Sequence, residues 1–225
     1  MDSVWQEVGR LLTHGDSSLW PIVWLSVQVS GTAVVIGSLI GLPLAAWLVM
    51  QKGAWVVTVR SCLNALMGFP PVVLGLLVYL LLSRSGPLGH WGILFTPSAM
   101  VVAQVLLITP IITALAAQSL ADEHRQLARL LDVLHVRGLL RLRTLLWETR
   151  HSLFTAVLAG LGRAFAEVGA VMMVGGNIDG ATRVMTTAIA LETSKGELAT
   201  AIALGIILLC LVFLLNLLAQ AVRRK

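Results

Sequence analysis

Long stretches without charged residues dominate the pattern along this chain. Asp, Glu, Lys and Arg are absent from residues 17–51, 61–83, 85–121 and 198–222, and the apolar segment 152–175 contains only two charges. A helix needs about 20 apolar residues to cross ~30 Å of hydrocarbon. The pattern therefore predicts an all-α polytopic membrane protein in one domain, 1–225. About five transmembrane helices are expected, at about 19–50, 57–82, 97–119, 152–175 and 198–222.

The first residues, 1–17, have a different pattern. Val4, Val8, Leu11 and Leu12 recur at helical spacing, while Glu7 and Arg10 fall on the other side. This amphipathic pattern predicts a short helix lying in the membrane interface. A frayed terminus is the alternative.

The distribution of basic residues predicts the orientation. Of the 16 Lys and Arg residues, 11 lie at one set of helix edges, four at the opposite set, and Arg163 lies within the fourth helix. Cytoplasmic loops carry the excess of positive charge. The N-terminus is therefore expected outside and the C-terminus in the cytoplasm. Basic residues at the cytoplasmic edges of the membrane explain the net charge of +5, so a nucleic-acid partner is not needed to account for it.

The longest predicted cytoplasmic segment, 121–151, is amphipathic and contains six arginines. A solvated connector would not need its many leucines. One interpretation is a short helix presented to a groove of a partner protein. The alternative is packing of this segment under its own membrane helices.

The same segment resembles a loop found in the membrane subunits of bacterial ABC importers. That loop reads Glu-Ala-Ala, three residues, Gly, nine residues, Ile-x-Leu-Pro, and it docks in a cleft of the ATPase. In the best alignment, the Glu-Ala-Ala triplet corresponds to Arg129-Leu130-Leu131 and the Gly to His135. The Ile corresponds to Leu145, and the Leu-Pro pair to Trp147-Glu148. The segment matches this loop in its position and length more than in its residue identities. Gly138 is a candidate for the bend that the Gly of the motif would form. The resemblance implies contact with an ATPase through Leu131, Leu134, His135, Val136, Arg137 and Gly138.

Other stretches are similar to molybdate and tungstate permeases. They include 69–76, 83–89 and 109–112, and the most specific, 162–180 with 182–196, is closest to the tungstate branch. The resemblance implies a type I ABC importer bundle in the cell (inner) membrane, assembled as a homodimer. It also implies two ATPase subunits, which would bind ATP and Mg, and an extracytoplasmic oxyanion-binding protein. Tungstate is the expected substrate, with molybdate or another oxyanion as the alternative.

Two charges lie within the fourth predicted membrane helix. Arg163 and Glu167 are four residues apart, so they share a helical face and are expected to pair. Arg163 falls about 17 Å into the helix, at 1.5 Å per residue, where charges usually face a bundle interior or a pathway. A structural ion pair and a gate beside the translocation path both fit this position.

A second candidate lies where the fourth helix ends. Consecutive glycines, Gly175 and Gly176, precede Asn177, and successive backbone N–H groups in such a turn can attract anions. With Arg183 nearby, the turn could guide an oxyanion. A plain helix cap is the alternative.

Motifs of catalysis are absent from the sequence. No Gly-Lys pair occurs, so there is no phosphate-binding loop, and neither a His-Glu-x-x-His motif nor paired cysteines at metal spacing occur. We therefore expect no catalytic residue, metal or cofactor in this chain. A secondary transporter driven by an ion gradient remains an alternative, with Glu167 as its one acidic candidate within the membrane, and a scaffold without transport is a more remote one.

Overall fold

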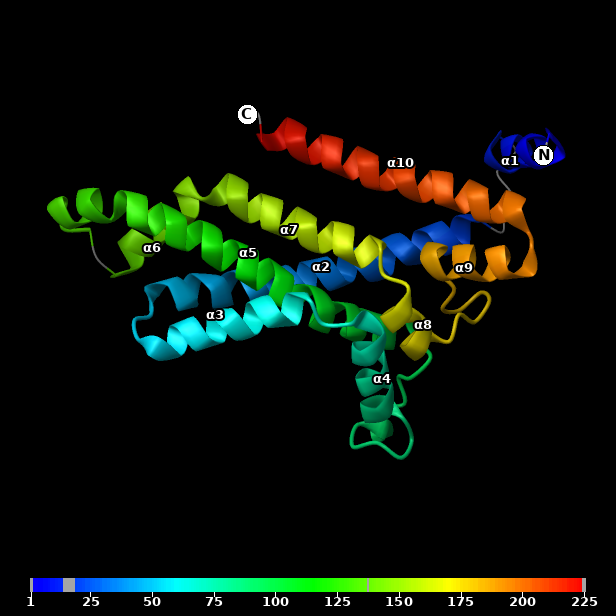
Figure 1. The fold of residues 1–225 in the computed structure, drawn as a ribbon, viewed down its shortest axis with the longest axis horizontal. Coiled ribbons are helices and arrows are strands. Elements are labelled where there is room, and N and C mark those ends of the chain that lie inside the picture. Colours follow the sequence, from blue (N-terminus) through cyan, green and yellow to red (C-terminus); the bar gives the residue numbers. More distant parts are fainter. Residues whose placement is uncertain (1, 14–18, 137, 224–225) are drawn as a thin grey trace. The chain divides into compact units, whose positions relative to one another are not determined.

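The computed structural model describes residues 2–13, 19–136 and 138–223, and this part of the chain is built of helices and connecting loops (Figure 1). In chain order the helices are α1 (Asp2–Thr13), α2 (Leu19–Met50), α3 (Ala54–Met67), α4 (Pro71–Leu82), the short 3-10 helix η1 (Gly89–Trp91), α5 (Pro97–Val133), α6 (Gly138–Glu148), α7 (Arg150–Phe165), α8 (Gly169–Gly175), α9 (Met185–Lys195) and α10 (Leu198–Arg223).

The chain divides into two compact units whose boundaries fall inside α2, α5 and α7 and between α3 and α4. Unit 1 comprises Met1–Ala33, Pro70–Gln104 and Gly162–Lys225, and unit 2 comprises Val34–Phe69 and Val105–Leu161. Each unit has its own apolar core.

In unit 1, α4 packs against α8, and both α1 and α9 pack against α10 (Figure 1). The core contains alanines, valines and a methionine, among them Met100, Val171 and Val174, all less than 2% exposed. Gly75 permits the close approach of α4 to α8, because a Cβ at this position would lie 2.7 Å from Cα of Ala170. Small residues at such contacts let helix backbones pack tightly in membranes.

In unit 2, residues of α2, α5, α6 and α7 share one core. Leu120 and Leu145 are fully buried there, together with alanines such as Ala45 and Ala156. Gly160 of α7 again marks a close approach, since a Cβ there would lie 2.7 Å from Cγ1 of Ile112 in α5. The neighbouring side chains leave no room for a larger residue at this point.

Several predicted elements are confirmed. α2 has the expected bounds, α10 begins at the expected Leu198, and α1 occupies the described part of the predicted N-terminal segment. Residues 14–17 of that segment lie outside the described residues. α5 begins at Pro97 as expected, but it continues to Val133 and thereby supplies the first part of the segment 121–151.

Two predicted helices are wrong in one respect, because each is broken. The segment 57–82 forms α3 and α4, with Gly68 ending the first helix and Pro71 occupying the first turn of the second. Proline has no backbone N–H and suits the start of a helix better than its interior. The segment 152–175 likewise forms α7 and α8, interrupted at residues 166–168. α9 was not predicted.

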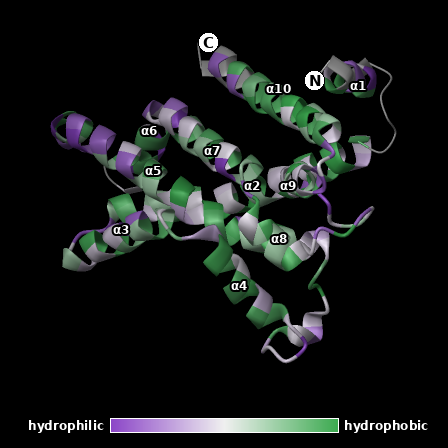
Figure 2. Ribbon diagram, turned by 45° about the vertical axis from the view of Figure 1, so that its right-hand side comes forward, coloured by the Kyte–Doolittle hydropathy of each residue, from purple (hydrophilic) through white to green (hydrophobic). Residues whose placement is uncertain are grey.

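The apolar helices are long enough for a polytopic membrane protein. α2, α5 and α10 each contain a stretch that can cross a bilayer, and the described residues provide up to five spans if the bent pairs α3–α4 and α7–α8 each form one. Figure 2 shows apolar residues along α4 and α10, whereas hydrophilic residues gather at the end of α5 and over α6. The predicted class is confirmed, while the orientation stays a prediction.

Candidate functional site

The break between α7 and α8 holds an ion pair. Nη1 of Arg163 lies 2.8 Å from Oε2 of Glu167, and the two side chains are 30% and 2% exposed. The predicted pairing of these residues is therefore confirmed. Glu167 is not inside a continuous helix, however, because α7 has ended at Phe165.

The carboxylate of Glu167 also caps α8. Its second oxygen, Oε1, accepts a hydrogen bond of 2.8 Å from the backbone N–H of Ala170. The first N–H groups of a helix have no partner within that helix, and an anion there is favoured by the helix dipole. One side chain thus neutralises Arg163 and begins the next helix.

Polar groups from three other segments converge on the same break. The hydroxyl of Thr186 donates to the carbonyl of Glu167 at 2.8 Å, and the side-chain amide of Gln104 donates to the carbonyl of Ala164 at 3.1 Å. The N–H of Met185 donates to Oγ of Ser26 at 2.8 Å. α5 and the start of α9 are thereby tied to the broken helix, and Ser26 ties α2 to the start of α9, all within unit 1.

A small cavity lies among these groups. Its volume is about 10 Å³, and Gln104, Glu167, Ser26 and Ser30 contribute to its walls. Oε1 of Gln104 is buried without a hydrogen-bond partner in the described part of the protein. The volume is close to the minimum that one water needs, so a single water is the acceptable occupant, and a tetrahedral oxyanion is too large for it.

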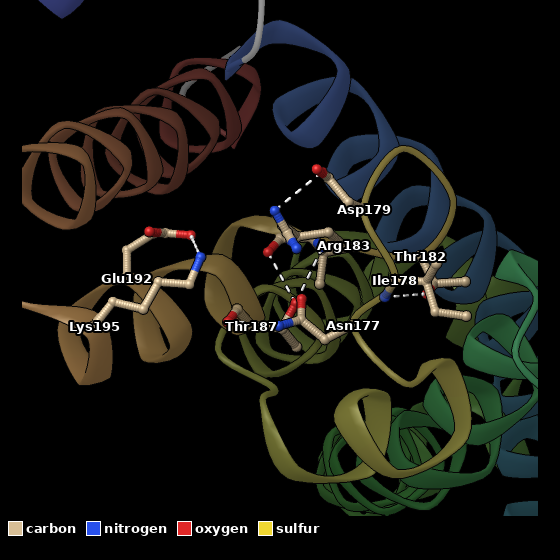
Figure 3. Close-up of polar contacts among 9 residues, drawn as sticks. Asn177, Ile178, Asp179, Thr182, Arg183, Thr187, Glu192 and Lys195 are labelled. Carbon is tan, nitrogen blue, oxygen red and sulfur yellow. Dashed lines mark hydrogen bonds and ion pairs between the residues drawn. The ribbon is translucent and has the colours of Figure 1, made fainter. Parts of the chain in front are cut away.

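The chain leaves α8 through a compact turn. Gly176 and Asn177 both have positive φ, 72° and 51°, and the N–H of Gly176 donates to the carbonyl of Met172 at 3.0 Å. This is a helix cap, in which glycine adopts the left-handed conformation without steric cost. Nδ2 of Asn177 lies 3.5 Å from the carbonyl oxygen of Thr187 (Figure 3).

Arg183 belongs to the same turn but is neutralised. Nη1 of Arg183 lies 3.0 Å from Oδ1 of Asp179, and the two side chains are drawn toward each other in Figure 3. Both residues line a groove of about 500 Å³ that the exposed Trp24 also borders. Tryptophan is enriched at the level of lipid headgroups, which suits a position at a membrane surface.

In unit 2, the predicted coupling residues have different environments. Leu131 is 3% exposed and belongs to the core, whereas Leu134 is 61% exposed. His135 and Gly138 have positive φ, 54° and 56°. The N–H of Val136 donates to the carbonyl of Leu131 at 2.9 Å, and Arg137 lies outside the described residues.

Arg141 fixes α6 to the end of α5. Its Nη1 lies 2.7 Å from Oδ1 of Asp132, and its Nη2 lies 2.8 Å from Nε2 of His124. Arg141 is a permanent cation, so it donates and the ring nitrogen of His124 accepts, which requires a neutral ring. Burial, followed by the charge of Arg141, lowers the pKa of His124, which lies in the charged part of α5 beyond Ser119.

The surface of α6 has an apolar groove. Leu139, Leu142, Leu146 and Trp147 line it together with Arg143, and its volume is about 380 Å³. Leu139 and Trp147 are 81% and 65% exposed. Large exposed apolar residues beside arginines are typical of a docking surface for another protein.

Comparison with known proteins decides the family. No protein-family model matches the chain. The tungstate uptake system permease protein TupB of Peptoclostridium acidaminophilum is 38% identical over 207 residues, covering 92% of this chain and 91% of that protein. A probable anion ABC transporter permease of Haloferax volcanii is 41% identical over 217 residues, covering 91% of this chain and 90% of that protein.

This chain belongs to the ABC transporter permease family. A putative molybdenum transport system permease of Bacillus subtilis, 27% identical over 194 residues, is a more distant relative that covers 80% of this chain and 84% of its own length. Together with the apolar helices, the relatives identify the chain as a multi-pass permease of the cell membrane.

The permease brings only part of the predicted site residues together. Arg163, Glu167, Gly175, Gly176, Asn177 and Arg183 belong to unit 1, and the predicted coupling residues belong to unit 2. Within unit 1, Arg163 pairs with Glu167, and Arg183 pairs with Asp179. Among the described residues, no group of His, Cys, Asp and Glu side chains is arranged to hold a metal ion.

Sequence reasoning missed Gln104, Ser26 and Thr186, which surround the broken helix. A signal was present for Gln104, because it is an isolated amide in a long uncharged stretch. A polar side chain in such a place must find a partner within the protein. Thr186 and Ser26 carried no comparable signal, since hydroxyls are common in membrane helices.

Proposed function

We propose that this permease is the membrane-spanning subunit of an ATP-driven importer for an oxyanion, with tungstate as the first candidate substrate. The observation that carries the proposal is the 38% identity to a tungstate uptake permease along nine tenths of both chains. Molybdate is the closest alternative, because more distant relatives are molybdenum transport permeases.

The proposed role is to form the pathway while another subunit hydrolyses ATP. A homodimer with two ATPase subunits and an extracytoplasmic binding protein is the expected assembly, and ATP and Mg would be bound by the ATPase. The groove of α6 supports the proposed ATPase contact, because it exposes Leu139 and Trp147 beside Arg143.

The ion pair at the helix break supports a place beside the pathway. A bare arginine would attract a dianion and hold it, whereas Arg163 is neutralised by Glu167 at 2.8 Å. Weak binding suits conduction better than storage. We propose that Arg163 and Glu167, together with the turn that contains Gly175, Gly176, Asn177 and Arg183, lie along the route of the anion.

The test is uptake by the reconstituted complex. The permease is expressed with a candidate ATPase and a candidate oxyanion-binding protein from the same genome, and vesicle uptake of tungstate, molybdate and sulfate is measured with and without ATP. Uptake of tungstate that requires ATP and a hydrolysis-competent ATPase is the expected result.

Two outcomes would contradict parts of this proposal. Uptake that persists without the ATPase and stops with an uncoupler would instead indicate an ion-driven transporter. ATP-dependent uptake of molybdate or sulfate in preference to tungstate would keep the importer and change its substrate.

A further inference from the structure

Unit 2 contains a polar pocket that the transport proposal does not use. It lies between α3 and α5, has a volume of about 270 Å³, and is lined by Arg60 and Asn64 of α3 and by Gln118 and Arg125 of α5, among others. Leu63 and Ala114, both buried, pack against each other beneath it and hold the two helices together.

The spacing of the polar residues places them on facing sides of the two helices. Arg60 and Asn64 are four residues apart on α3, and Gln118 and Arg125 are seven apart on α5. Residues at these intervals share one helical face. These four polar residues therefore line the same space between the two helices, with Arg60 half-buried and Asn64, Gln118 and Arg125 at its exposed edge.

The positive charge in the pocket is only half compensated. Nη2 of Arg125 lies 2.7 Å from Oδ1 of Asp122, outside on the surface of α5. Arg60 has no ion pair with a carboxylate anywhere in the described ranges, and its Nε is buried without a hydrogen-bond partner. Two other arginines with a similarly buried Nε, Arg141 and Arg183, are each paired with an aspartate.

A buried donor on a cation without an acceptor calls for a missing partner, such as an ion or ordered water. The planar guanidinium matches the oxygens of tetrahedral oxyanions and phosphates, and the NH₂ groups of Asn64 and Gln118 supply further donors. From these observations we propose that the pocket between α3 and α5 binds a tetrahedral oxyanion group, carried either by a free dianion or by the phosphate of a lipid headgroup.

The site is tested with the full permease in nanodiscs of two compositions. In neutral phosphatidylcholine discs, binding of tungstate is measured by equilibrium dialysis. From discs containing phosphatidylglycerol, the permease is extracted and purified. The anionic lipid that stays bound to the permease is then measured by mass spectrometry. Arg60→Gln removes the uncompensated charge, and Arg129→Gln removes an equal charge from an exposed position of α5 outside the pocket.

The expected result is at least a tenfold loss of binding in Arg60→Gln in one of the two arms, with Arg129→Gln equal to wild type. Loss in the tungstate arm identifies a free dianion as the ligand, and loss in the lipid arm identifies a headgroup. Arg60→Lys, which keeps the charge, should retain part of the binding, and Asn64→Ala should weaken it severalfold.

Equal binding by Arg60→Gln and wild type in both arms, or equal loss in Arg60→Gln and Arg129→Gln, would overturn the proposal. Size-exclusion profiles show whether the variants are folded, and Asn64→Ala tests the pocket independently of the arginine. Neither arm measures ATP-driven uptake, so failure of this site leaves the proposed transport function to its own experiment.

Discussion

Arg163 and Glu167 form an ion pair of 2.8 Å across the interruption between α7 and α8, with the glutamate 2% and the arginine 30% exposed. The same carboxylate accepts the N–H of Ala170 at the start of α8. Helix geometry and charge neutralisation at this point therefore depend on one side chain.

Replacing Glu167 should lower stability in two steps. Glu167→Gln keeps an oxygen for the N–H of Ala170 but removes the charge, leaving Arg163 without its partner, and should cost about 1–3 kcal/mol. Glu167→Ala loses the helix cap as well, which adds about 1 kcal/mol. In thermal unfolding of the purified complex, the melting temperature should decrease from wild type to Glu167→Gln and again from Glu167→Gln to Glu167→Ala.

The matched control for this series is Glu192→Gln. Glu192 pairs with Lys195 at 3.0 Å, but the lysine is 49% exposed, and exposed pairs contribute at most about 1 kcal/mol. A melting temperature of Glu167→Gln no lower than that of Glu192→Gln would show that the pair at the break is not structural.

A second prediction concerns the contact between α4 and α8. In Gly75→Ala the new Cβ would lie 2.7 Å from Cα of Ala170 and 3.1 Å from Cβ of Met173, and the first is a backbone atom that cannot rotate away. Separation of the two helices should cost about 1–3 kcal/mol. The measurement is thermal unfolding in detergent.

Gly205→Ala in α10 is the control, because a Cβ there meets no atom within 4 Å. Alanine favours a helix over glycine by up to about 1 kcal/mol, so this variant should unfold at the same or a higher temperature. If Gly75→Ala matched it, the contact between α4 and α8 would be looser than the structure shows.

Much of the fold could be predicted because charge is excluded from hydrocarbon. The bounds of α2 coincide with an uncharged stretch that ends just before Lys52. The same reasoning could not place the break in 57–82, since one continuous helix and two helices joined at Pro70-Pro71 would both be uncharged from 61 to 83. In the structure Gly68 ends α3 and Pro71 lies in the first turn of α4, and hydropathy does not distinguish these cases.

The candidate site could be predicted only where it depends on local spacing. Arg163 and Glu167 pair because they are four residues apart, which the sequence states directly. The hydrogen bond from Gln104 to Ala164 joins residues 60 positions apart, and only the packing of α5 against α7 within unit 1 brings them together. α9 was missed because its threonines and charges interrupt the apolar pattern.

The junction of α5 and α6 should respond to pH through His124. Burial has the largest effect and, with the charge of Arg141 and a smaller effect of Lys52, lowers the pKa of His124 from 6.5, while Asp132 acts in the opposite direction. A group whose folded-state pKa lies below the unfolded value stabilises the fold above the unfolded pKa, and this contribution is lost as the pH falls through the folded pKa. Protonation also removes the acceptor for Arg141.

Hydrogen exchange of residues 121–136 and 138–151, corrected for intrinsic rates, should therefore become faster as the pH falls below 6.5, the ordinary pKa of histidine. His124→Gln, which cannot titrate, should remove most of this change, and His90→Gln, in η1 of unit 1, should preserve it. An equal response to pH in both variants would exclude His124 as its origin.

The groove of α6 provides the test of coupling to the ATPase. Leu139 is 81% exposed, so Leu139→Asp should leave the stability of the permease nearly unchanged while placing a charge in an apolar contact. Bulky acids at Arg137 and Gly138 should act in the same way, although Gly138→Glu also adds strain at φ 56°. We expect ATP-driven uptake to decrease at least tenfold, while the ATPase still hydrolyses ATP.

Leu131→Ala separates coupling from packing. Leu131 is 3% exposed and lies in the core of unit 2, so its truncation should cost about 2–5 kcal/mol of stability. Uptake per folded complex should then change little, in contrast to Leu139→Asp, because the groove itself is intact. If Leu139→Asp left uptake at the wild-type level with a wild-type ATPase, α6 would not be the docking surface, and the packing of this segment against its own membrane helices would account for its leucines.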